Sequence, residues 1–228
     1  MENNEQTVER NSAYKRLLES CTHEAAEANT IPREAFENYR VKRGLREKDG
    51  TGVMAGVTNI GNVHGYIISE GEKVADDGML EYRGLDMAEL VDGFSAENRY
   101  GFEECAYLLL FGKLPTATEL EEFNPLLAES RHLPPRFTED ILMKATSPSI
   151  MNKMAVGVLS LYAYDENPDD TSLENMLRQS IEIIARLPVI AAQSYAVYRS
   201  NFFGKSLNLH TPHNDLSTAQ NFLRVLRS

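Results

Sequence analysis

The sequence has few of the features that mark secreted, metal-binding or membrane proteins. It contains only two cysteines, Cys21 and Cys105, which lie too far apart to indicate a disulfide framework and show no metal-ligand spacing. No apolar run reaches the roughly 18 residues of a membrane helix. The first thirty residues are polar and lack the apolar core of a signal peptide. We therefore expect a soluble, cytoplasmic protein with reduced cysteines.

Basic residues are also scarce. The 228 residues include 23 Lys and Arg against 34 Asp and Glu, which gives a net charge of −11. This balance disfavours a large nucleic-acid footprint or a polybasic membrane surface. Any anionic ligand must be held by a few placed arginines. With 42% hydrophobic residues, the chain can form the core of one large or two small domains.

Several familiar chemical motifs are missing. There is no Gly-x-Ser-x-Gly elbow, Walker loop or metallopeptidase helix. Residues 50–55 match the dinucleotide fingerprint G-x-G-x-x-G/A in letters, but charged residues precede them where an apolar strand is needed. The acidic residues 165–170 lack the glycine and the terminal glutamate of an EF-hand, so they indicate a solvated loop between helices.

The most apolar long stretch covers residues 172–199, and it predicts a central helix. Thr171 and Glu174 have the spacing of a capping box at its start. Because the second half is apolar all round, we expect it to be buried on every side, by other helices or by a second subunit. Pro188 removes one backbone hydrogen bond and predicts a bend that costs about 3 kcal/mol unless packing compensates.

The remaining pattern predicts a mainly α fold with a small β-rich patch near residues 52–82. In that patch short β-branched runs are broken by glycines, with a turn at residues 70–73 and a short strand at 79–82. Residues 1–40 are charged and helix-permissive, so we expect a helical N-terminal extension before a large helical domain at 41–228. Apolar residues spaced three and four apart predict further helices at residues 86–92, 102–111, 116–127, 138–145, 149–164 and 217–226. The first of these is expected to break at Gly93.

Five histidines are candidates for chemistry. His23 and His132 lie in polar surroundings that predict solvation, and His64 lies in the β-rich patch, where a structural role is expected. His210 and His213 flank Pro212 in an extended segment. They are the only catalytic candidates, and a zinc site is not predicted because only Asp215 is near as a further ligand. The residues by themselves identify no cofactor-binding site and no complete catalytic set.

Six stretches together resemble the N-terminal portion of the large domain of the citrate synthase family, in its bacterial branch. They follow the family's order and span about residues 41–226. The stretches are residues 49–52 (DGTG) with the glycine-rich patch after them, 80–84 (LEYRG), 102–115 (FEECAYLLLFGKLP), 149–165, 184–188 (IARLP) and 217–223 (STAQNFL).

The resemblance implies a multi-helical fold and an acyltransferase of the tricarboxylic acid cycle. The implied reaction condenses acetyl-CoA with oxaloacetate to give citrate and CoA, without a permanently bound cofactor. A histidine and an aspartate enolise the thioester, another histidine polarises the ketone, and arginines hold the carboxylates. The implied assembly is a homodimer through the helices at 149–164 and 172–199.

The resemblance also implies that the catalytic C-terminal half lies outside this chain. The family's active-site motifs follow the segment that matches residues 217–226, so we expect this segment alone to be inactive. Residues 207–213 (LNLHTPH) superficially resemble the first of those motifs, but Pro212 stands in place of its acidic residue. The segment also comes before the match at residues 217–226, whereas the family's motif follows it. The alternative is a non-catalytic helical module for dimerisation or partner binding. Acyl-CoA specificity, allosteric control and contacts of Arg43 or Arg46 with CoA stay open.

Overall fold

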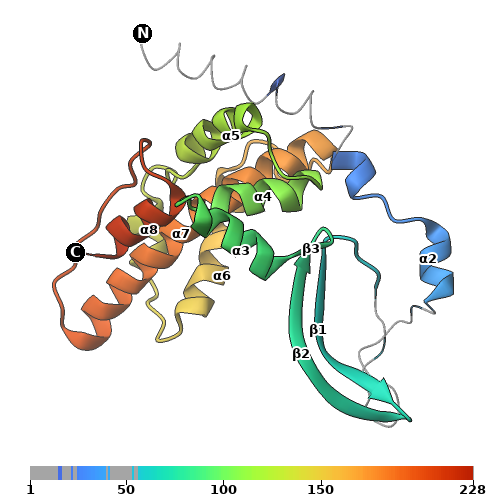
Figure 1. Cartoon of the computed structure of the whole chain (residues 1–228). Helices are drawn as coiled ribbons and strands as arrows, with labels where there is room; N and C mark the ends of the chain where they lie inside the picture. Colours follow the sequence, from blue (N-terminus) through green and yellow to red (C-terminus); the bar gives the residue numbers. More distant parts are fainter. Residues whose placement is uncertain are drawn as a thin grey trace. The chain divides into compact units, whose positions relative to one another are not determined.

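The computed structural model describes residues 15–16, 22, 25–39, 41, 53 and 56–227 (Figure 1). The chain divides into two compact units, His23–Leu114 and Pro115–Ser228 together with Met1–Thr22. The division expected at residue 40 stays a prediction. Cys21, His23, Arg43, Arg46 and most of the glycine motif at 50–55 lie outside the described residues.

The first unit holds the sheet and three described helices. Its three strands form one antiparallel sheet in the order β1-β2-β3. The mainly α fold with a small β-rich patch is therefore confirmed. The elements are α2 (Arg33–Asn38), β1 (Gly61–Ser69), β2 (Glu72–Tyr82), β3 (Leu85–Asp86), α3 (Met87–Ala96) and α4 (Phe102–Phe111).

A long hairpin of β1 and β2 dominates the β-rich patch. The two strands are joined by Glu70 and Gly71, both in the left-handed region with φ of 51° and 86°. Such two-residue turns match the right-handed twist of paired strands, and glycine accepts the positive φ without strain. The predicted turn is confirmed, but the strand expected at 79–82 is only the end of an eleven-residue strand.

Arg83 fixes the end of the hairpin within this unit. Its guanidinium donates to the backbone carbonyls of Ala28 and Leu109 at 2.8 and 2.7 Å. It also donates to the side-chain oxygens of Asn29 and Asn59 at 2.8 and 3.2 Å. Burial lowers the pKa of Arg83. One side chain therefore joins three segments that are far apart in the sequence.

The two helices after the sheet differ in how well the sequence predicts their ends. Asp86 caps α3 by accepting from the backbone of Ala88 and Glu89. The break predicted at Gly93 is wrong, because α3 continues to Ala96. A helical glycine costs only about 1 kcal/mol, and the buried Leu90 and Phe94 anchor α3 on both sides of Gly93. The predicted stop of α4 at Gly112 is confirmed, with φ of 77°.

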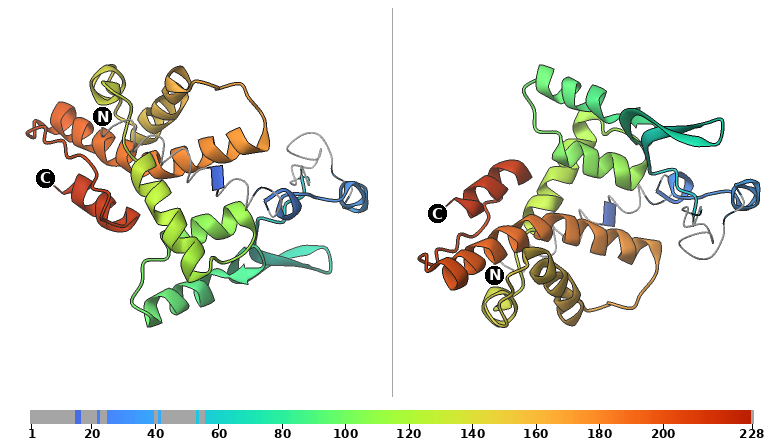
Figure 2. Two further views of the ribbon diagram at one scale, coloured as in Figure 1. Left: turned by 90° about the horizontal axis from the view of Figure 1, so that it is seen from above. Right: turned by 90° about the horizontal axis from the view of Figure 1, so that it is seen from below.

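The second unit is a group of helices packed on one long helix. α5, α6 and α8 all contact α7, and Figure 2 shows them arranged along it. A capping box of Thr116 and Glu119 opens the first of them. The elements are α5 (Ala117–Ser130), the π-helix η1 (Thr138–Leu142), α6 (Ile150–Leu161), the 3-10 helix η2 (Tyr162–Tyr164), α7 (Leu173–Phe203) and α8 (Thr218–Leu226).

The ends of α7 differ from the prediction. Its cap is Ser172, whose hydroxyl accepts from the backbone of Asn175, so the capping box placed at Thr171 is wrong by one residue. The helix continues past Arg199 to Phe203, because the next residue that takes a left-handed conformation is Gly204, with φ of 62°. Pro188 lies inside the helix and does not end it.

Packing within one chain covers only part of α7. In the second half of α7, Ile190 is fully buried but Tyr195 is 36% exposed, and in the first half Met176 and Ile183 are 50 and 37% exposed. The burial expected on every side is therefore not reached by a single chain, and the alternative of a second subunit remains. In the part of the chain that is described, no helix combines the length and apolar character needed to cross a membrane.

Candidate functional site

Both candidate histidines lie in the segment between α7 and α8, and we call residues 210–217 the histidine loop. Arg131, at the C-terminal end of α5, donates to the carbonyls of His213 and Leu216 at 3.1 and 2.7 Å. Asn221 of α8 donates to the same two carbonyls at 2.7 and 3.0 Å. Its side-chain oxygen accepts from the backbone N–H of His213 at 2.8 Å. Two buried polar side chains thus fix the loop backbone.

Further side chains hold the rest of the histidine loop. Arg224 donates to the carbonyl of Thr211 at 2.6 Å, and Gln193 of α7 donates to that of His210 at 3.4 Å. His132, which we expected to be merely solvated, is exposed but pairs with the Asn214 side chain at 2.9 Å. The loop is consequently attached to α5, α7 and α8 through its backbone.

The histidine side chains have a different environment from the loop backbone. His213 is 50% exposed, and its Nδ1 lies 3.7 Å from the carboxylate of Asp215, which is 81% exposed. This separation is too long for a hydrogen bond. Among the described residues no group of three or more His, Cys, Asp or Glu could hold a metal ion. The loop therefore presents His213 to solvent without a bonded carboxylate partner.

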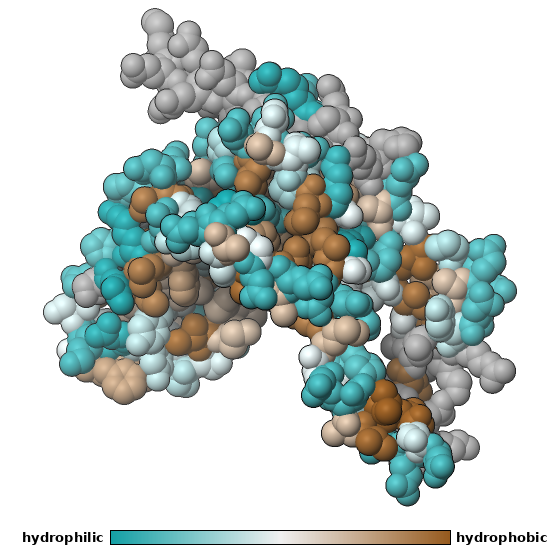
Figure 3. Space-filling model, viewed as in Figure 1, coloured by the Kyte–Doolittle hydropathy of each residue, from teal (hydrophilic) through white to brown (hydrophobic). Residues whose placement is uncertain are grey.

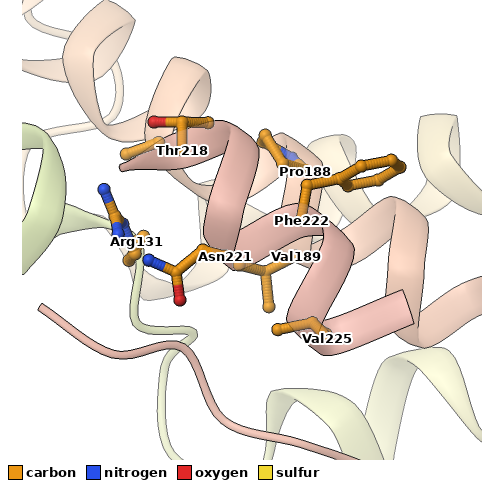
Figure 4. Close-up of a pocket in the computed structure, with 8 residues that line it drawn as sticks. Arg131, Pro188, Val189, Thr218, Asn221, Phe222 and Val225 are labelled. Atoms are coloured by element: carbon orange, nitrogen blue, oxygen red, sulfur yellow. The ribbon is translucent and has the colours of Figure 1, made fainter. Parts of the chain in front are cut away.

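A shallow depression lies where α8 packs against α7. It opens to solvent and leaves little enclosed space. Figure 4 shows Arg131 and Asn221 side by side at one end, and Pro188 and Phe222 at the other. The sequence did not suggest this site, because its residues come from three separate segments. The lining residues are Arg131, Ala185, Pro188, Val189, Thr218, Asn221, Phe222 and Val225.

The acidic loop before α7 is not simply solvated, as the sequence suggested. Asp165 is 14% exposed and accepts from Arg178 at 2.6 Å and from Gln179 at 2.9 Å. Burial alone would raise the pKa of Asp165, but hydrogen bonds from the Asn167 backbone, Gln179 and Arg178 outweigh it and lower that pKa. Arg178 also reaches Glu182 at 3.1 Å. This network fastens the loop to α7.

His64 has the structural setting that the sequence predicted. Its Nε2 lies 3.0 Å from a carboxylate oxygen of Asp76 on the neighbouring strand. The hydrogen bond from His64 is the largest cause that lowers the pKa of Asp76. The pair connects β1 to β2 and lies on the partly exposed hairpin, so it supports the hairpin rather than a reaction site.

Apolar side chains on α6 and α7 are left uncovered in the single chain. Met151 and Leu159 of α6 are 73 and 76% exposed, and Tyr162, the first residue of η2 directly after α6, is 57% exposed. On α7, Met176 and Ile183 are also exposed. We call these five residues the α6–α7 stripes. Exposed apolar surface of this kind marks interaction sites in soluble proteins.

Residues 49–228 match the family model described as citrate synthase, C-terminal domain. The citrate synthase of Corynebacterium glutamicum is 32% identical over 155 residues, which cover 66% of this chain and 32% of that protein. The crystal structure of citrate synthase from Pyrobaculum aerophilum has a TM-score of 0.60 and 27% identity, and the match covers 82% of this chain and 46% of that one.

A second similar structure is that of the Thermoplasma acidophilum citrate synthase, in a ternary complex with carboxymethyl coenzyme A and oxaloacetate. Its TM-score is 0.58 at 20% identity, with 75% of this chain and 39% of that one covered, which shows a shared fold. The chain thus spans less than half the length of each of these three proteins.

Proposed function

Because the chain belongs to the citrate synthase family, we propose that it is the N-terminal portion of the large helical domain of an enzyme that condenses acetyl-CoA with oxaloacetate. The match over residues 49–228 carries this proposal. The fold shared with a relative that binds carboxymethyl coenzyme A and oxaloacetate supports the substrates. Acetyl-CoA is then a co-substrate, no cofactor stays bound, and the enzyme works in the cytoplasm as an acyltransferase.

In this proposal the described segment is a scaffold and does not catalyse condensation alone. Enolising a thioester needs a positioned base beside donors that stabilise the developing oxyanion. The side chain of His213 is half exposed and that of Asp215 is largely in water, where such interactions are weak, and the two lie 3.7 Å apart. The hydrogen bonds of Arg131 and Asn221 hold the loop backbone at defined positions beside α8. These residues position the chain and do not supply the chemistry.

The same proposal includes a homodimer through the α6–α7 stripes. A two-fold axis would bring the same stripes of two subunits together, which is the commonest way for a soluble oligomer to bury one apolar patch. The large exposed fractions of Met151 and Leu159 support this role. They equally suit the alternative, a non-catalytic dimerisation or partner-binding module, which would lack condensing activity in every context.

The test is the release of CoA thiol by purified protein given acetyl-CoA and oxaloacetate. We expect the 228-residue chain to stay at the rate without protein. A longer polypeptide that includes the family's histidine motifs should turn over. Absence of turnover in that longer polypeptide would favour the non-catalytic module. Turnover by the chain itself that is lost in His210→Ala or His213→Ala would contradict the scaffold role.

A further inference from the structure

Strand β1 has an edge that carries none of the usual protection against strand pairing. The sheet order is β1-β2-β3, so β1 lies at the edge. Among the described residues, β2 is the only strand that pairs with it. Natural edge strands are usually short, charged or interrupted by proline. The nine residues of β1, GNVHGYIIS, include no Lys, Arg, Asp, Glu or Pro. Among the described residues, this edge is therefore open to a further strand.

The hairpin also has an uncovered aliphatic face. Val63 pairs with Leu80 and Ile67 with Val74, and directly paired residues share a face. Their exposed fractions are 81, 36, 45 and 44%, and Figure 3 shows apolar surface gathered on the hairpin. A two-stranded hairpin alone is only marginally stable in water. A sheet of three or more strands with one apolar face can be stable on its own.

The free edge of β1 is regular along its length. His64 pairs with Met79 and Tyr66 with Ala75, so two steps along β1 (66 − 64) face four along β2 (79 − 75). The irregularity thus lies in β2, and β1 stays a continuous strand from Gly61 to Ser69. A regular strand can add a partner along its whole outer side.

We propose that β1 pairs antiparallel with β1 of a second copy of this chain, about a two-fold axis at Gly65. The result is a four-stranded sheet in the order β2-β1-β1-β2. Side chains along a strand alternate between the two faces of the sheet. The aliphatic faces of the two subunits therefore lie on the same side only if the two-fold axis passes through a residue and not between two residues. Centring on Gly65 places Val63 opposite Ile67 of the partner subunit, an aliphatic pair that occurs twice.

The charge distribution selects this partner and this edge. The acids of the two strands all lie on β2, at Glu72, Asp76, Asp77 and Glu81, whereas β1 holds no acid and no Lys or Arg, and its titratable groups are His64 and Tyr66. Pairing through β1 brings neutral residues together and leaves the acidic strands on the outside. Pairing through β2 would place like charges opposite one another, which is destabilising. A second copy needs no complementary charge and repeats the same aliphatic face.

A thiol at the axis tests the register in the full 228-residue chain. A Cβ added at Gly65 meets nothing within 4 Å, so Gly65→Cys fits the hairpin. The Cα atoms of the two introduced cysteines would lie about 4.5–5.5 Å apart, which is within the range of a disulfide. In the matched control Asn62→Cys, on the same strand and also exposed, the two thiols would lie roughly 20 Å apart. Mild oxidation and a non-reducing gel measure the result.

We expect a covalent dimer from Gly65→Cys and none beyond the unsubstituted chain from Asn62→Cys. Equal cross-linking of both variants, or no dimer from Gly65→Cys, would overturn the proposal. The pairing uses neither α6 nor α7, so it goes beyond the proposed function and can fail independently of it.

A second pair of variants separates the edge from the aliphatic face. Val63→Lys places a charge on the edge strand at an 81% exposed position, so it should not disturb the single chain. Added to Gly65→Cys, it should lower dimer yield about tenfold, a loss of about 1.4 kcal/mol in pairing. Val74→Lys lies on the same face but on β2, and should change the yield less than twofold. Equal losses in both would show that the face, and not the edge, is the docking surface.

Discussion

Single side chains join distant segments of this protein, and Arg83 is the clearest case. It donates to acceptors at residues 28–29, 59 and 109. Arg83→Lys would remove the planar fork that serves several acceptors at once. We expect the free energy of unfolding to fall by about 2–3 kcal/mol in urea titrations. The control Arg136→Lys changes an ion pair whose Arg136 side chain is 77% exposed, and it should cost less than about 0.5 kcal/mol. Equal losses would show that the Arg83 network contributes little.

Asp165 gives a prediction about pH. Hydrogen bonds lower its folded-state pKa below the unfolded value of about 4. Its stabilising effect is therefore fully present above pH 4 and is lost as the pH falls through the lower, folded-state pKa. Asp165→Asn should lower the free energy of unfolding by about 1–3 kcal/mol at pH 7 and by clearly less at pH 3.

Urea midpoints at the two pH values measure this effect. Asp215→Asn is the matched control, because the Asp215 side chain is 81% exposed. It should change neither midpoint appreciably. An Asp165→Asn loss that is the same at pH 3 as at pH 7 would contradict the role of the ionised carboxylate.

Some residues at helix ends could be predicted from sequence, whereas the residues that hold the site could not. The caps at Thr116 and Ser217 depend on neighbours within one turn, and both residues form capping boxes at the starts of predicted helices. Arg131 and Asn221 act on carbonyls of the histidine loop, and the Arg131 acceptors lie more than 80 residues away. Local spacing carries no record of such partners. The histidines attracted notice because they are chemically distinctive, although the loop is held by their backbone atoms.

At the scale of elements, apolar spacing predicted the helices well and predicted burial badly. Almost every predicted helix exists, because apolar residues that recur every three and four positions are a property of a single helix. Burial depends on what lies opposite each face. Ile190 and Ala192 are covered within the chain, whereas Met176 on the same helix is half exposed. The apolar residues of α7 therefore belong to two surfaces that the sequence does not distinguish.

The first turn of α8 is the element on which the histidine loop depends. Ser217 and Gln220 form a reciprocal capping box at 3.2 and 2.9 Å. Ser217→Ala should lower the free energy of unfolding by about 1 kcal/mol, because it leaves a helix N–H without its partner. Ser206→Ala, at an exposed position before the loop, serves as the control and should change it by less than about 0.5 kcal/mol. Equal effects in thermal unfolding would argue against the cap.

At the scale of the whole molecule, the order of six short stretches identified the family when no single motif did. Residues 49–228 match its family model, and the helical class follows from the same chain. The catalytic chemistry could not be predicted from these residues. In a segment that we propose to be a scaffold, the pattern of residue types reflects packing and not catalysis. The assembly is a matter of surfaces, and Leu159 at 76% exposure is a better test of it than Ile190 or Ala192, whose substitution by Asp would disrupt the core itself.

The most direct test of the account is the mass of the folded chain in solution, measured by light scattering at micromolar concentration. Val63→Lys serves as the background, so that β1 pairing does not contribute. We predict twice the chain mass of 25.6 kDa in this background. Adding Leu159→Asp should give 25.6 kDa with unchanged helix content, whereas Leu114→Asp, at a 41% exposed position outside the stripes, should leave the dimer intact. A monomer in the background itself, or a dimer that persists with Leu159→Asp, would contradict the role of the α6–α7 stripes as the subunit interface.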